Sequence, residues 1–275
     1  MKRIVLACVA LSLAIASTAQ TDSTQKDKAD TIKVGGVIII RKGGNNDSSD
    51  NKSIVISNKN KDRNSKVSTN WWIVDLGFAN YNDNTSYGVG GAQQFAPGMN
   101  DEHFKLRTGK SVNVNIWFFM QRLSLIKRAV NLKYGLGLEL NNYRFDDERV
   151  RFSENPTVIS LDETYKGFSK NKLAADYITV PVMLNFNFSP KRKRGFGFSA
   201  GVSGGYLYSA RQKIKDDGNK DKLHDDFDLR KWKLSYIGEL NLGPVKLYGS
   251  YAMKSMWEKG LDQTPYNVGI RLSHF

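Results

Sequence analysis

Two segments of the chain carry a lysine and a glutamate at the same spacing. Lys133 precedes Glu139 by six residues, and Lys233 precedes Glu239 by the same interval. Side chains an even number of positions apart lie on one face of a β-strand, and the residues around both pairs alternate between polar and apolar. Because an unpaired buried charge is costly, we expect these four groups to be ion-paired if the strands enclose them.

Two further charges, on the polar faces of other alternating segments, complete a candidate polar network. Its members are Asp75, Lys133, Glu139, Lys233, Glu239 and Arg271. Two roles fit these residues: a hydrogen-bonded network that fills a narrow interior, or a path for protons or ions. A closed sheet of eight strands is only wide enough for side chains to fill it. That width favours the filled interior and argues against a general diffusion pore.

Residues for other chemistry are sparse. The three histidines are His103, His224 and His274. The first two lie in acidic stretches typical of solvated loops, and His274 points to the opposite face from Ser273, which does not suit a nucleophile and its base. A separate acidic stretch at 216–221 lacks the oxygen spacing and the closing glutamate of a calcium loop. The sequence therefore predicts no catalytic, cofactor-binding or metal site.

The N-terminus has the three parts of a secretory signal peptide. Lys2 and Arg3 precede an apolar run, and the small residues 17–19 follow it, so we expect residues 1–20 to be cleaved. The single cysteine, Cys8, lies inside the apolar run. A lipoprotein signal is the alternative, but it would leave almost no hydrophobic sequence before Cys8. Cleavage would give a mature chain without disulfides or thiolate metal sites.

Residues 21–69 differ in composition from the rest of the chain. Asp, Ser, Asn, Lys and Gly dominate them, and two short β-prone runs interrupt them at 31–40 and 53–57. Such a segment buries too little apolar surface to offset the entropy of ordering. We expect a mostly disordered, low-complexity periplasmic extension. A hairpin, or a strand added to a partner protein, is the alternative.

Residues 70–275 contain eight runs in which apolar and polar residues alternate. A period of two predicts β-strands. The runs are 71–78, 112–118, 132–141, 178–188, 196–208, 232–242, 245–254 and 266–275. Single-chain bacterial barrels have an even number of strands, and one uncharged apolar face on each strand suits contact with lipid. The sequence therefore predicts an all-β fold, an eight-stranded antiparallel transmembrane β-barrel.

The connections between these runs alternate in length. Those at 81–110, 145–175 and 209–228 are long, those at 120–129, 189–195 and 243–244 are shorter, and the one at 255–264 is intermediate. Outer-membrane barrels have long extracellular loops and short periplasmic turns. A secreted, lipocalin-like carrier would show the same alternation with its apolar face inward. In the first run, we assign Trp71, Ile73 and Asp75 to the inner face.

The chain ends inside a predicted strand, at Phe275. A closed barrel pairs its last strand with its first, so that no strand edge is left exposed. We expect Phe275 to be a C-terminal signal for insertion by the barrel-assembly machinery. Strict alternation from Tyr266 nevertheless places Phe275 on the inner face unless a bulge intervenes.

The formal charge of +14 indicates attraction to polyanions. A secreted chain rarely meets nucleic acid, so we expect no nucleic-acid partner. Anionic lipopolysaccharide and outer-membrane lipid surround a barrel in this membrane and are the expected partners. Residues 21–69 are the segment expected to contact a periplasmic protein.

Three stretches of the barrel region have a distinctive pattern. They are Asp176-Tyr-Ile-Thr-Val-Pro-Val-Met-Leu-Asn185, Gly195-Phe-Gly-Phe-Ser-Ala-Gly-Val-Ser-Gly-Gly-Tyr-Leu-Tyr208 and Asn267-Val-Gly-Ile-Arg-Leu-Ser-His-Phe275. These stretches resemble the Bacteroidetes outer-membrane β-barrel family that includes PorT-type and porin-like small barrels. The resemblance covers residues 70–275 and implies an outer-membrane barrel of mostly unassigned role, with PorT-type members associated with type IX secretion. We therefore expect a non-enzymatic barrel with a structural or interaction role in the cell envelope. A lipid-modifying barrel enzyme is the alternative.

Overall fold

A computed structural model describes most of the chain from residue 66 onward. The described residues are 30–34, 37–41 and 57–58, by backbone alone, and 66–88, 90–162, 170–189, 195–216, 219–243 and 245–272. The chain divides into two compact units, Met1–Asn64 and Ser65–Phe275. Within the described residues, no helix has the length and apolar character needed to cross a membrane.

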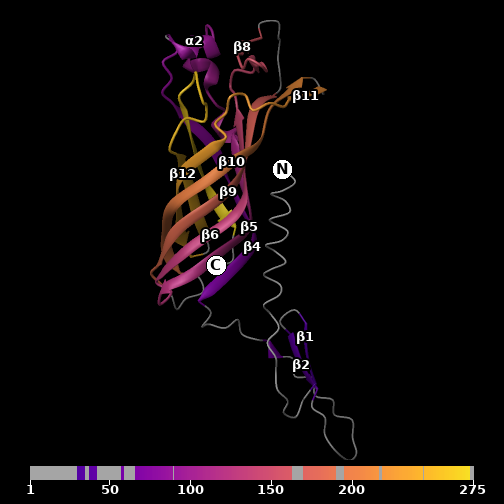
Figure 1. Ribbon diagram of the computed structural model, residues 1–275, viewed down its shortest axis with the longest axis vertical. Coiled ribbons are helices and arrows are strands. Elements are labelled where there is room, and N and C mark those ends of the chain that lie inside the picture. Colours follow the sequence, from indigo (N-terminus) through magenta and orange to yellow (C-terminus); the bar gives the residue numbers. More distant parts are fainter. Residues whose placement is uncertain are drawn as a thin grey trace, which may run out of the picture. The chain divides into compact units, whose positions relative to one another are not determined.

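The second unit is a closed barrel in which eight antiparallel strands form a ring (Figure 1). In ring order the strands are β4 (Val67–Asp83), β5 (Val112–Ile126), β6 (Val130–Arg144), β9 (Lys170–Asn187), β10 (Phe196–Asp216), β12 (Trp232–Leu242), β13 (Val245–Ala252) and β14 (Gln263–Leu272). The last strand pairs with the first, from Gln263 opposite Asp83 to Leu272 opposite Val74. The predicted eight-stranded antiparallel barrel is confirmed.

Smaller elements lie in the connections and in the first unit. In the barrel unit they are α2 (Gly91–Phe95), the 3₁₀-helices Asp101–Phe104 and Thr108–Lys110, the pair β7 (Val150–Phe152) and β8 (Ile159–Leu161), and β11 (Asn219–Leu223), which pairs with β10. The first unit contains a three-stranded sheet of β1 (Asp30–Val34), β2 (Val37–Arg41) and β3 (Ser57–Asn58). The hairpin β1–β2 coincides with the first of the two β-prone runs, 31–40, and extends one residue beyond it at each end.

The two ends of the barrel differ in the length of their connections. The loop end carries the connections 84–111, 145–169, 217–231 and 253–262, and the turn end carries 127–129, 188–195 and 243–244. Figure 1 shows α2, β8 and β11 together at the loop end. The expected alternation in length is therefore confirmed.

Several predicted strand ends were wrong, and three differ by eight residues: β9 begins at Lys170 and not at 178, β5 ends at Ile126 and not at 118, and β10 ends at Asp216 and not at 208. β5 continues to Ile126 and leaves only a tight turn, in which Lys127 and Arg128 both have positive φ and the Ala129 amide donates to the Ile126 carbonyl. Positive φ at two consecutive central residues is typical of the type I′ turn, whose twist matches that of the paired strands on either side. β10 likewise continues to Asp216, because its upper half pairs with β9 and then with β11.

The apolar faces of the strands point outward. Leu76, Val180, Leu240 and Val268 are all exposed, whereas polar residues of the opposite parity are buried. This facing suits lipid outside and a polar lumen, so the lipocalin-like alternative, with its apolar face inward, was wrong. One inner-face assignment was also wrong: Trp71 is 66% exposed. Trp72 beside it has a φ of 56°, which interrupts the pleat and changes the facing of the preceding residue.

Candidate functional site

Six charged side chains from four strands meet in the lumen. They are Asp75 on β4, Lys133 and Glu139 on β6, Lys233 and Glu239 on β12, and Arg271 on β14, and each residue is at most 7% exposed. The structure thus brings together all the residues that the sequence placed in a polar network. Unpaired charges at this depth would be costly, so the contacts among them decide whether the lumen is stable.

The two lysine–glutamate pairs exchange partners across the lumen. Lys133 forms a salt bridge with Glu239, and Lys233 forms one with Glu139. β6 and β12 run in opposite directions around the ring. Because the lysine precedes the glutamate by the same interval on both strands, each lysine meets the glutamate of the other strand. The equal spacing in the sequence therefore gives two ion pairs at two levels of the barrel, and neither pair is formed within a strand.

Arg271 links one of these ion pairs to Asp75. Its Nε and Nη2 each donate to a carboxylate oxygen of Asp75 at 2.7 Å, and its Nη1 donates to Glu239. The guanidinium also lies over the Trp117 ring, with Cζ 5.5 Å from the ring centroid. The Trp117 indole N–H donates to Asp75 at 2.7 Å. Arg271 thus has two carboxylate partners and an aromatic face in one geometry, which matches the planar fork of arginine.

Neutral side chains complete the network. The Asn115 amide donates to Asp75 at 3.2 Å, the Asn267 amide donates to Glu139 at 3.1 Å, and the Ser199 hydroxyl donates to Glu239 at 3.2 Å. The network predicted from the sequence did not include any of these three residues. They could have been found from the alternation of the strands, because alternate positions of each strand line the lumen and these residues fall on the inward-facing positions, as the charged residues do.

Little open space remains at the level of the network. A cavity of about 30 Å³ lies among Trp117, Glu139, Met183, Glu239 and Arg271. A single water needs roughly 10–15 Å³ of such space, so this cavity has room for about two waters. At this level the lumen is filled by side chains.

An aromatic cluster closes the loop end, and each of the four long connections contributes to it. Its central members are Phe95 and Phe104, Phe145 and Phe152, Phe227, and Trp257, all nearly or fully buried. The rings form a continuous series of contacts. Phe104 contacts Phe145, Phe145 contacts Phe152, and Phe152 contacts both Phe227 and Trp257, with distances between ring centroids of 5.3–6.4 Å. We call these six residues the aromatic cap.

Polar contacts tie the aromatic cap to the barrel wall. Gln212 on β10 is 2% exposed, accepts from the Phe152 amide at 3.1 Å, and donates to the Val150 carbonyl at 2.8 Å. Trp257 donates from its indole to Gln263 on β14 at 2.8 Å. Sequence reasoning missed this cluster because its members are scattered singly among charged loop residues.

The remaining residues considered from the sequence do not form a second site. His103 accepts the Asn100 amide through Nδ1 at 3.1 Å as part of a helix cap, and His224 is exposed. His274 and Phe275 lie outside the described residues. In the described part of the chain, no cluster of three or more His, Cys, Asp or Glu side chains could hold a metal ion.

The comparison with protein families agrees with this architecture. Residues 49–253 match the family described as outer membrane protein beta-barrel domain. Among solved structures, the chain is similar to the crystal structure of Neisserial surface protein A (NspA) at 12% identity and a TM-score of 0.33, over 76% of this chain and 99% of that chain. None of the curated proteins matches the sequence.

Proposed function

The chain belongs to the outer membrane protein beta-barrel domain family, and from this premise we propose that it is a closed, non-enzymatic barrel acting by contact in the cell envelope. The observation that carries the proposal is the filled lumen. Four buried salt bridges and their hydrogen-bonded neighbours occupy the interior: Arg271–Asp75, Arg271–Glu239, Lys133–Glu239 and Lys233–Glu139.

Because the interior is closed, we assign the function to contacts made by the surfaces of the protein. Transport through the lumen would require charged groups to separate, and breaking a buried ion pair costs about 3–5 kcal/mol. The aromatic cap adds a second obstruction at the loop end, where Phe152 and Trp257 are stacked with their ring planes 13° apart. The surfaces left for partners are the outside of the loop end, the lipid-facing wall and the segment 21–69.

We assign these surfaces to compartments by the usual asymmetry of outer-membrane barrels, with long loops outside the cell and short turns in the periplasm. In this orientation the loop end faces lipopolysaccharide. The segment 21–69 is periplasmic, and the chain reaches the first strand of the barrel from that side. A PorT-like role in secretion fits this arrangement, with residues 21–69 contacting a periplasmic protein.

Conductance measurements test the closed lumen. The purified full-length protein, inserted into planar lipid bilayers, should give no stable conductance steps, because the ion pairs fill the lumen. The matched variant Lys233→Ala/Glu139→Ala removes one pair without leaving an unpaired charge, and we expect it to conduct more than the wild type. Stable ohmic steps from the wild type would contradict the proposal.

Two further experiments test the role in contacts. Residues 21–69, fused to a carrier and exposed to periplasmic extract, should retain a specific protein, and a scrambled segment of equal composition is the control. Loss of type IX secretion on deletion of the gene would support the PorT-like role. Altered lipid A, detected by mass spectrometry in a strain that overproduces the protein, would favour the enzymatic alternative.

A further inference from the structure

The barrel wall has a gap in its hydrogen bonding between β12 and β13. The last contact of the regular ladder is the Met253 amide donating to the Leu234 carbonyl at 2.9 Å, and the next joins the Arg230 amide to the Met256 carbonyl at 2.7 Å. Between them, no backbone hydrogen bond joins residues 231–233 to residues 254–255, all of which the structure describes. We call this gap the lateral opening.

The gap arises because the chain leaves the sheet after β13. Residues 253–254 form a bend, and beyond Met253 the chain no longer follows β12. The Ser255 carbonyl accepts from the Arg230 side chain at 3.2 Å, and Arg230 also donates to the Trp257 carbonyl at 3.0 Å. The Arg230 side chain thus ties the bent segment to the residue that lies just before β12.

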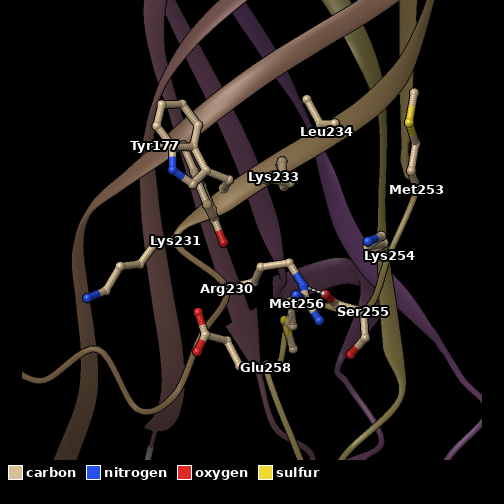
Figure 2. Close-up of a pocket in the computed structure, with 11 residues that line it drawn as sticks. Tyr177, Arg230, Lys231, Lys233, Leu234, Met253, Lys254, Ser255, Met256 and Glu258 are labelled. Atoms are coloured by element: carbon tan, nitrogen blue, oxygen red, sulfur yellow. Dashed lines mark hydrogen bonds between the residues drawn. The ribbon is translucent and has the colours of Figure 1, made fainter.

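A pocket of about 340 Å³ occupies the lateral opening (Figure 2). Its outer walls are Trp232, Leu234 and Met253, which are exposed on the lipid-facing surface. Its floor includes Tyr177 and Lys233, which are buried and face the lumen. Because the lining includes residues of both faces, the pocket passes through the wall from the lipid side.

The floor of the pocket is closed by the lumen network. Lys233 is bound to Glu139, and its Nζ lies 4.8 Å from the centroid of the Tyr177 ring. Lys233 is therefore already neutralised, and the pocket ends at this contact. A ligand that enters from the side meets a surface that is mostly apolar, although charged residues are among those that line it.

The rim of the pocket is positively charged. Lys231 and Lys254 are exposed at the rim, and Glu258 is the carboxylate among the lining residues. Lys231 lies 3.9 Å from Asp226, and more than half of each side chain is exposed, so solvent screens this pair. Lys254 has no hydrogen bond or salt bridge within the described part of the chain. Both ammonium groups are therefore available to an anion.

We propose that the lateral opening binds an amphiphile with a single acyl chain and an anionic head group. The acyl chain lies in the apolar pocket, and the head group pairs with Lys254 at the rim, while Lys231 lies on the opposite side of the pocket and adds to its positive charge (Figure 2). The volume favours one chain over several, because it is at the lower end of the range of about 300–1,000 Å³ for small-ligand sites. The exposed ammonium group of Lys254 beside an apolar surface matches the two ends of such a molecule. The proposal does not depend on whether the lumen conducts.

A brominated fatty acid can test this site by quenching tryptophan fluorescence. The full-length protein carries Trp71→Phe/Trp72→Phe, which removes two other exposed indoles, and is reconstituted in phosphatidylcholine vesicles. Bromine on the acyl chain should quench Trp232 saturably. The methyl ester of the same fatty acid partitions into the bilayer without a charge, and we expect its quenching to rise linearly without saturation.

Variants of the rim separate binding from partitioning. In the same background, Lys231→Ala/Lys254→Ala should weaken saturable binding by about tenfold, the lower end of what charge-assisted contacts supply. Lys254→Glu should weaken it at least as much. The control Lys105→Ala/Lys110→Ala removes two loop cations elsewhere and should leave binding unchanged. Heat-modifiable gel mobility verifies that each barrel is folded.

Three results would overturn the proposal. The first is quenching of Trp232 by the fatty acid that rises linearly, without saturation, in the protein that keeps both rim lysines. The second is an affinity of the folded Lys231→Ala/Lys254→Ala variant for the fatty acid equal to that of the protein with both lysines. The third is saturable binding of the methyl ester with the affinity of the acid. In that case an apolar chain would suffice, and the charged rim would have no part in recognition.

Discussion

Arg271 and Asp75 are direct partners across the seam where the last strand of the barrel meets the first. They are opposite each other in the β14–β4 register, and two parallel hydrogen bonds of 2.7 Å join the guanidinium to the carboxylate. The seam therefore closes with a bidentate ion pair in the lumen as well as with backbone hydrogen bonds.

This pair predicts an asymmetry between single and double variants. Arg271→Met leaves the Asp75 carboxylate buried without its main partner, and should lower the free energy of unfolding by about 3–5 kcal/mol. Arg271→Met/Asp75→Leu leaves no unpaired Asp75 and should cost less than Arg271→Met alone. Denaturant unfolding in detergent micelles, followed by gel mobility, measures both. A double variant less stable than Arg271→Met would contradict the assigned pairing.

The cross-lumen pairs predict that a charge swap is partly tolerated. Lys233→Glu and Glu139→Lys should each cost about 3 kcal/mol or more, since each leaves like charges in contact. Combining them restores an ion pair but loses the contact of Lys233 with the Tyr177 ring. We expect the double variant to recover roughly half of the lost stability in a double-mutant cycle. Additive losses would show that these two side chains are not coupled.

The aromatic cap predicts a local effect of truncation. Trp257→Ala removes a fully buried ring that contacts Phe95 and Phe152, and such truncations cost about 3–5 kcal/mol. Because the ring contacts of the cap join residues of the loops, we expect faster trypsin cleavage in the connections while the barrel keeps its folded gel mobility. Glu258→Ala, an exposed change in the same connection, is the control. Unchanged cleavage of Trp257→Ala would argue against a cap that orders the loops.

Removal of the terminal aromatic residue is expected to impair assembly. Deleting Phe275 should lower the amount of folded barrel in the outer membrane, because the assembly machinery would lose its C-terminal signal. Phe275→Tyr keeps an aromatic ring and is the matched control. Equal amounts of folded protein in the deletion strain and the wild type, judged by gel mobility, would show that Phe275 is dispensable.

The strand pattern made the barrel predictable from the sequence because alternation, turns and closure all follow from local spacing. The charged lumen residues were predictable for the same reason, since their parity fixes their facing. Their partners were not, because contacts such as Lys133 with Glu239 depend on how β6 and β12 align across the lumen. The assignment of Trp71 to the inner face was wrong because alternation assumes a regular pleat, which the left-handed conformation of Trp72 interrupts.

Features of the loop end needed the three-dimensional structure. The members of the aromatic cap come from four separate connections, and no periodic signal links Phe104, Phe152 and Trp257. The lateral opening is equally invisible in the sequence, because the run 245–254 keeps its alternation to residue 254 although the chain leaves the sheet at Met253.

The exchanged ion pairs also constrain how the barrel can close. β9 and β10 lie between β6 and β12 in the ring, so a slip of two residues at any of the three intervening seams would displace both lysines from both glutamates. Such a slip keeps every side chain on its proper face, and the apolar pattern therefore does not oppose it. It would instead leave four charges without partners in the lumen, at a cost of several kcal/mol. The repeated six-residue spacing thus selects one closure register among those that the lipid-facing surface would accept.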